Sequence, residues 1–228
     1  MPSIKPQARL MLSLLLLLTL WACASVPPET GTGRMTWQCD AQGDSAVHQE
    51  DWQRALRLHE QFLAAHPDNC LAIYHLGYIW SRLGDRDKEI TYYERAAACG
   101  YDRDDQLYFN LGMAYGETDQ MGKAIAAFQR AVAINPDNAD DWFGLGLTAR
   151  SAGRPDLARQ AFTKAVTLDS RHWDARIELA RVDLDEGLLD EARIQLEAVQ
   201  KGAPEHEELQ GLWRIYHDRR MTLYDSGK

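Results

Sequence analysis

Small residues recur along this chain at a nearly constant interval. The series Gly43, Gly77, Gly112, Gly146 and Ala180 advances by 34 or 35 residues at each step. Two further series keep the same register: Ala55, Glu89, Ala124, Ala158 and Ala192, and Pro67, Tyr101, Pro136, Ser170 and Pro204. Such a period is typical of supersecondary units that stack and bury a shared core. The chain is therefore expected to form a row of similar units within one elongated domain.

Each unit has the pattern of two helices joined by a turn. In the third unit, Tyr108, Leu111 and Tyr115 form one amphipathic face, and Ala124, Phe128 and Ala131 form the next. Pro136 then ends the second helix, because proline lacks an amide donor and disfavours helix in the residue before it. The unit is predicted to be a helical hairpin.

The glycine series needs a compensating gain, since glycine inside a helix costs about 1 kcal/mol relative to alanine. We expect this gain to be a close approach of the partner helix to Gly77, Gly112 and Gly146. The small residues Ala124 and Ala158 are expected to lie opposite.

The third unit resembles the tetratricopeptide repeat (TPR) consensus at Tyr108, Leu111-Gly112, Tyr115, Ala124, Phe128, Ala131 and Pro136. The resemblance implies an all-α, right-handed solenoid of about five helical hairpins and a C-terminal capping helix. The repeats are placed at 36–69, 70–104, 105–138, 139–172 and 173–206, and the capping helix and tail at 207–228. The match weakens in the first and fifth units, as is common for terminal repeats.

The N-terminus has the features of an export signal. Lys5 and Arg9 precede an apolar run over 10–20 that is short for a membrane span, and the run ends in Leu20-Trp21-Ala22-Cys23. This ending resembles the bacterial lipobox, which implies a signal peptide at 1–22 and lipidation (palmitate among the acyl chains) at Cys23. The alternative is a short membrane anchor that stays attached.

Residues 23–35 are expected to form a flexible, lipidated tether, because they contain proline and glycine without apolar periodicity. In the lipoprotein family, Ala24 rather than aspartate favours transfer to the outer membrane, facing the periplasm. Loss of Lys5 and Arg9 with the signal takes two positive charges from a net charge of −9, which leaves −11. So acidic a chain is not expected to bind nucleic acid, and its membrane attachment would depend on the lipid.

No catalytic or metal-binding motif is visible, so we predict a non-enzyme without cofactor or metal. Seven histidines are scattered without a zinc signature. His59 occupies the aromatic position of its repeat, which favours a packed core histidine over a ligand. The acidic pairs Asp104-Asp105 and Asp140-Asp141 are expected at helix starts, where carboxylates favourably meet the helix dipole.

Three further cysteines, Cys39, Cys70 and Cys99, are expected at one edge of the stack. In an oxidising periplasm one disulfide could form, Cys70 with Cys99 or Cys39 with Cys70. Three reduced thiols are the alternative, because the required Cα separation does not follow from sequence.

We predict that the chain binds its partner in a groove. In TPR stacks the first helices line the concave face, and repeat positions five and nine point into it. These positions are Tyr74, Tyr78, Phe109, Met113, Phe143, Leu147, Ile177 and Arg181. Arg82, Asn110 and Arg150 lie nearby and could orient a carboxylate or a backbone group. Aromatic residues and methionine are enriched in interfaces, so a protein or peptide partner is expected, unless some of these side chains pack between hairpins.

By resemblance, lipoproteins of this build include pilotins for type IV pilus secretins and adaptors for peptidoglycan hydrolases. An outer-membrane scaffold that assembles or localises an envelope complex is therefore the expected function. The alternative within the non-enzyme class is a self-assembling structural lipoprotein, a homo-oligomer. An enzyme or cofactor binder is a third alternative, which no activated nucleophile or ligand cluster in the sequence supports.

Overall fold

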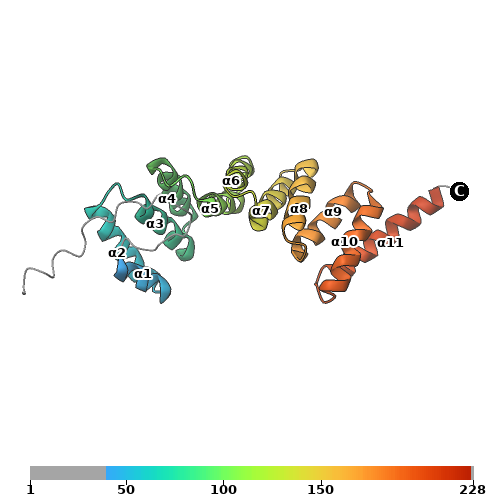
Figure 1. The fold of residues 1–228 in the computed structure, drawn as a ribbon, viewed down its shortest axis with the longest axis horizontal. Coiled ribbons are helices and arrows are strands. Elements are labelled where there is room, and N and C mark those ends of the chain that lie inside the picture. Colours follow the sequence, from blue (N-terminus) through green and yellow to red (C-terminus); the bar gives the residue numbers. More distant parts are fainter. Residues whose placement is uncertain (1–39, 227–228) are drawn as a thin grey trace, which may run out of the picture. The chain divides into compact units, whose positions relative to one another are not determined.

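The computed structural model describes residues 40–226, and all the regular elements in this range are α-helices. They follow one another along the chain in Figure 1. The helices are α1 (Ala41–His48), α2 (Trp52–Ala65), α3 (Cys70–Leu83), α4 (Arg86–Cys99), α5 (Asp105–Glu117), α6 (Met121–Ile134), α7 (Ala139–Ser151), α8 (Pro155–Leu168), α9 (Trp173–Asp185), α10 (Leu189–Gly202) and α11 (Leu209–Ser226). Each predicted repeat holds one pair of these helices, and α11 lies in the predicted cap.

Several predicted features lie outside the described residues. They are the signal segment 1–22, the lipidation site Cys23, the tether 23–35 and the thiol of Cys39. Within residues 40–226, none of the helices is both long enough and apolar enough to cross a membrane.

A backbone position with positive φ closes the turn inside every hairpin. Glycine occupies three of these turns, at Gly84 (80°), Gly153 (68°) and Gly187 (77°). Glu50 (56°) and Asp119 (63°) occupy the other two, although residues with a Cβ disfavour this region. All five positions share one register, so the geometry of the hairpin, rather than the residue type, dictates the left-handed turn.

Polar side chains cap the N-terminus of the first helix in several hairpins. The Asp104 carboxylate accepts a hydrogen bond from the Gln106 amide (2.9 Å), and the Asn138 side chain accepts one from the Asp140 amide (3.1 Å). These bonds satisfy amide groups that have no partner within the helix. The prediction that Asp104 belongs to a helix start is confirmed.

The two helices of a hairpin meet where an aromatic ring of the second lies on a glycine of the first. An ideal Cβ added to the glycine would overlap this ring, as the separations from the nearest ring atom show. The pairs are Gly77 with Tyr93 (2.5 Å), Gly112 with Phe128 (2.6 Å) and Gly146 with Phe162 (2.4 Å). All three rings are buried, so each glycine makes room for a core side chain.

This geometry corrects one expectation. We expected the partner helix to lie against the backbone at the glycines, opposite the small residues Ala124 and Ala158. The atoms nearest to Gly112 and Gly146 instead belong to the rings of Phe128 and Phe162. A flat ring fills the space that the missing Cβ leaves. Ala124 and Ala158 are also buried.

Helix α11 covers the C-terminal side of the fifth hairpin. Its residues Leu209, Leu212 and Tyr216 are buried in one cluster with Leu196 and Val199 of α10. Burial of such side chains stabilises each by roughly 1.5–3 kcal/mol relative to exposure. Helix α11 thereby removes an apolar face of the fifth hairpin from water.

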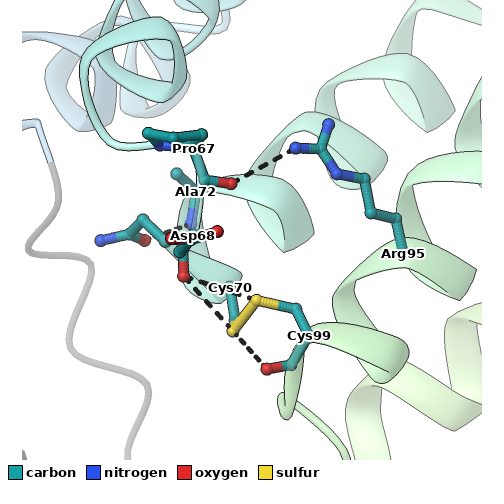
Figure 2. Close-up of a disulfide and its surroundings, with 7 residues drawn as sticks. Pro67, Asp68, Cys70, Ala72, Arg95 and Cys99 are labelled. Atoms are coloured by element: carbon teal, nitrogen blue, oxygen red, sulfur yellow. Dashed lines mark hydrogen bonds between the residues drawn. A yellow bond between two sulfur atoms is a disulfide. The ribbon is translucent and has the colours of Figure 1, made fainter.

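A disulfide joins the ends of α3 and α4. Cys70 begins α3 and Cys99 ends α4, and their Cα atoms lie 5.4 Å apart. Figure 2 shows this bridge beside Arg95, which donates a hydrogen bond to the Pro67 carbonyl (3.3 Å). The bridge is one of the two that the sequence left open, and it closes the hairpin at the edge where the chain enters and leaves it.

We predict that Gly146→Ala lowers the free energy of unfolding by about 2 kcal/mol, because the new methyl group displaces the Phe162 ring. The matched control is Gly122→Ala in α6, where an added Cβ meets no atom within 4 Å. This control should stabilise the chain by up to about 1 kcal/mol. Urea unfolding followed by circular dichroism measures both, and equal stability of the two variants would contradict the ring-on-glycine account.

We predict that the double variant Cys70→Ala and Cys99→Ala unfolds with a free energy about 3 kcal/mol lower than that of the oxidised protein. The bridge closes a loop with a sequence separation of 29, and its loss frees the unfolded chain. A reducing agent should destabilise the natural chain by a similar amount and leave the double variant unchanged. Insensitivity of the natural chain to the reductant would argue against the bridge.

Candidate functional site

An apolar strip lies on the first helices of the second, third and fourth hairpins. We use this name for five residues that keep part of their side chain exposed: Tyr78 of α3, Phe109 and Met113 of α5, and Phe143 and Leu147 of α7. Met113 is the most exposed of them, at 43%. Helices α5 and α7 contact each other directly, and a hydrogen bond joins α3 to α5. The strip is therefore built on neighbouring first helices.

The two phenylalanines of the strip are held by the core beneath them. Phe109 packs edge-on against Phe128, with ring centroids 5.6 Å apart. Phe143 lies 5.9 Å from the Phe162 ring and 4.6 Å from the His172 ring. Each ring thus offers solvent only part of its surface, and its orientation is set before any partner arrives.

Two residues predicted for the groove are buried instead. Tyr74 is 2% exposed, because its ring packs against those of Tyr93 (5.4 Å) and Tyr101 (5.0 Å). Ile177 is 1% exposed and belongs to the cluster of α9, α10 and α11. These two assignments were wrong, because neighbouring elements cover both side chains.

The polar residues predicted beside the groove have partners within the chain. Asn110 donates a hydrogen bond to the Tyr74 hydroxyl (3.0 Å), and the guanidinium of Arg82 lies over the Trp52 ring. Arg150 and Arg181 both face the carboxylate of Glu178, at 2.9 Å and 3.6 Å.

Glu178 is itself buried and belongs to α9. An internal carboxylate therefore already occupies the position next to Arg150 and Arg181 where we expected a ligand's carboxylate. These arginines are part of the stack's internal ion pairing.

A buried carboxyl lies between the third and fourth hairpins. Asp141 of α7 has no exposed surface, and burial together with the nearby charge of Asp105 raises its pKa to about 7. Asp105 accepts hydrogen bonds from the side chains of Asn135 (2.9 Å) and Asn138 (3.1 Å). Such a pKa suits acid–base chemistry, but a fully covered carboxyl cannot reach a substrate. The hydrogen bonds from Asn135 and Asn138 join the start of α5 to the connection between α6 and α7.

A second buried polar cluster lies among α1, α2 and α3. Nε2 of His59 and Nδ1 of His75 lie 3.7 Å and 3.8 Å from Oδ1 of Asp44, and all three side chains are buried. Burial lowers the pKa of His59, lowers that of His75 to about 3 and raises that of Asp44. The expectation that His59 packs in the core is confirmed, but its meeting with Asp44 and His75 was not foreseen.

The repeat register holds the signal that would have revealed this cluster. His59 occupies the place that Tyr93, Phe128 and Phe162 fill in later repeats, and Asp44 occupies that of Tyr78 and Met113. Two polar residues thus replace apolar ones at facing positions of the same repeat. Such a paired exchange indicates that the two side chains meet.

These features define the class of protein: an all-α array of helical hairpins that presents a partly exposed apolar strip. Two family models, both described as tetratricopeptide repeat, match residues 41–106 with 109–170, and residues 149–213. The chain belongs to the tetratricopeptide repeat family. It is a protein-interaction scaffold of a family that is generally non-enzymatic and whose members bind protein or peptide partners.

Curated relatives share the repeats over part of their length. Tetratricopeptide repeat protein 8 of Caenorhabditis elegans is 25% identical over 145 residues, which cover 63% of this chain and 28% of that protein. Superkiller protein 3 of Saccharomyces cerevisiae is 30% identical over 118 residues, which cover 51% of this chain and 8% of that protein. The chain therefore spans less than a third of these relatives.

Solved structures show the same fold. The crystal structure of MamA superposes with a TM-score of 0.68 at 26% identity and covers 72% of this chain and 95% of MamA. The structure of YrrB, described as a TPR protein with an unusual peptide-binding site, superposes with a TM-score of 0.69 at 20% identity. It covers 75% of this chain and 88% of YrrB. The second likeness is evidence of fold alone.

We predict that Asp141→Asn stabilises the chain more at pH 8 than at pH 5, by about 2 kcal/mol. A folded pKa of about 7 lies above the ordinary value of 3.8, so the folded state holds a proton that the unfolded state releases between these values. Stability that is present at low pH is therefore lost as the pH rises towards 7, and asparagine removes this loss. Urea titrations at both pH values measure the difference.

The control for this prediction is Asp137→Asn, in the exposed loop that precedes α7. This variant should change the free energy of unfolding equally at the two pH values. Asp137 is exposed, so its replacement by asparagine removes no buried charge. A pH-independent effect of Asp141→Asn would mean that Asp141 is already ionised in the folded chain at pH 5.

Proposed function

We propose that the chain is a lipid-anchored scaffold of the bacterial outer membrane that captures a protein partner on its apolar strip. In this role it assembles or localises an envelope complex, such as a pilus secretin or a cell-wall hydrolase. The lipid on Cys23 would hold the scaffold at the periplasmic face of the membrane, and the tether 23–35 would let the repeats reach the partner.

The observation that carries this proposal is the partial exposure of Tyr78, Phe109, Met113, Phe143 and Leu147 on successive first helices. Scattered apolar side chains on a surface need no explanation, but a row on neighbouring elements favours an interface. Aromatic residues and methionine are also the types enriched at the centres of interfaces.

The charges near the strip narrow the kind of partner. Arg150 pairs with Glu178, and Arg181 pairs with Glu178 and Glu208, so little positive charge remains for a terminal carboxylate. The net charge of −9 attracts basic rather than acidic chains. We therefore expect the partner to offer an apolar helix or extended segment flanked by lysine or arginine.

The disulfide supports an exported location. Bridges between cysteines persist in oxidising compartments and are rare where thiols are kept reduced. The Cys70–Cys99 bridge thus agrees with the export signal expected at 1–22. The two observations are independent, since one comes from the repeats and the other from the N-terminus.

The test is photocrosslinking in the cell from a photoreactive residue that replaces Met113. Met113 is a better position than Phe109 or Phe143, because those rings also pack on the core. We expect capture of a defined envelope protein, and we expect purified Met113→Glu to bind this protein at least tenfold more weakly. The matched control position is Leu168 of α8, an exposed apolar residue (38%) that lies outside the strip.

Each remaining outcome counts against the proposal. Equal capture from Leu168 and Met113 would mean that the strip has no special affinity. Capture of a second copy alone, with sedimentation that depends on concentration, would favour the self-assembling structural lipoprotein. The absence of any crosslinked product would mean that the strip is not a binding surface.

A further inference from the structure

We propose that Asp44, His59 and His75 form a binding site for one divalent transition-metal ion of the zinc class. The three side chains come from three consecutive helices, α1, α2 and α3. One ligand atom from each residue lies within 4.8 Å of the other two. Oδ1 of Asp44 lies 3.7 Å from Nε2 of His59 and 3.8 Å from Nδ1 of His75. Asp44 and His59 belong to the first repeat and His75 to the second, and none of the three is part of the apolar strip.

Two members of the cluster, Asp44 and His59, lack the hydrogen bonds that buried polar groups require. Within residues 40–226, neither carboxylate oxygen of Asp44 and neither ring nitrogen of His59 has a hydrogen-bond partner. The separations of 3.7 Å and 3.8 Å from Asp44 are too long for hydrogen bonds. Unsatisfied polar groups in a core are destabilising, so a component that binds these atoms is needed.

The other repeats show what an ordinary core looks like at these positions. In the second to fourth repeats the place of His59 holds Tyr93, Phe128 or Phe162, and the place of Asp44 holds an apolar or aromatic residue. The first repeat keeps the underlying glycine: a Cβ on Gly43 would lie 2.9 Å from Nε2 of His59. An aromatic ring without polar atoms would therefore fit at this position. The imidazole of His59 has the same place in the hairpin and in addition offers nitrogen atoms that can bind a metal ion.

The ligand set selects the class of ion. Two imidazoles and one carboxylate suit zinc and its first-row neighbours, whereas magnesium and calcium prefer oxygen ligands. Bonds of about 2.1 Å in a tetrahedral site place neighbouring ligand atoms roughly 3.4 Å apart. The observed separations from Asp44 exceed this value by less than half an ångström. All three ligand atoms lie within 4.8 Å of one another, so side-chain rotations would need to shorten the remaining separation as well. A fourth position would remain for water.

Such an ion would hold the N-terminal end of the array together. Helix α1 is the shortest described helix, with eight residues, and it packs on α2. A bound ion would tie α1 to α2 and also to α3 of the next hairpin. Because the unfolded chain does not hold the three ligands together, binding would stabilise the folded state.

The first measurement is the zinc content of the full-length chain, stripped with a chelator, incubated with Zn²⁺ and separated from free ion. We expect one tightly bound ion per chain and a melting temperature higher by about 5 °C when Zn²⁺ is in large excess over the dissociation constant. His59→Phe should bind no ion, and its melting temperature should not respond to Zn²⁺. Phenylalanine is the residue of later repeats at this position, so the variant keeps the core packing.

The matched control is His217→Gln in α11, which removes an exposed histidine far from the cluster in sequence. It should keep the bound ion. Asp44→Asn is a second variant that should weaken binding at least tenfold while circular dichroism remains helical. The proposal is overturned if the natural chain binds no more Zn²⁺ than His59→Phe does, or if His217→Gln rather than His59→Phe abolishes binding.

Discussion

The structure depends on the contact between an aromatic ring and a bare glycine backbone. Phe128 of α6 makes this contact twice, because its ring lies on Gly112 of α5 and also on Gly144 of α7. One side chain thus sets the separation of two helices within a hairpin and the approach of the next hairpin. Burying such a ring contributes roughly 1.5–3 kcal/mol, which exceeds the cost of about 1 kcal/mol for each helical glycine. The repeat therefore conserves a small residue and a ring together.

This contact explains how much the sequence could predict. Glycine, alanine and aromatic residues recur because the hairpin needs them at fixed places, so the period alone reveals the helix pairs. Exposure is different, since Tyr74 and Tyr78 are aromatic residues one turn apart on the same helix. Tyr74 is covered by Tyr101, which lies where an extra residue lengthens the connection between the second and third repeats. Periodicity carries no information about an irregular loop, so the burial of Tyr74 could not be predicted.

The charged residues show a second limit on what the sequence can predict. Arg150 and Arg181 occupy positions from which they could bind a ligand's carboxylate. The pairing of Glu178 with Arg181, three residues along the same helix, follows from helical spacing. The pairing of Arg150 with Glu178 of the next hairpin does not, because the two residues lie far apart in the sequence. Such a pair is visible only when neighbouring repeats are compared position by position. With these arginines paired inside the chain, the strip offers mainly apolar contact, and specificity would come from its shape and from the net negative charge of the chain.

A comparison of equivalent positions also distinguishes the first repeat from the later ones. The three polar residues of this cluster belong to three different helices and lie 15 and 16 residues apart in the sequence. A search for short zinc motifs therefore does not find them. An imidazole can replace a phenyl ring on Gly43 with little change of shape, but it brings two nitrogens into a core where apolar atoms would be cheaper to bury. An aspartate at the facing position increases that cost instead of removing it. The proposed ion would bind the polar atoms of Asp44 and His59 that lack a hydrogen-bond partner, and would thereby offset the cost of burying them.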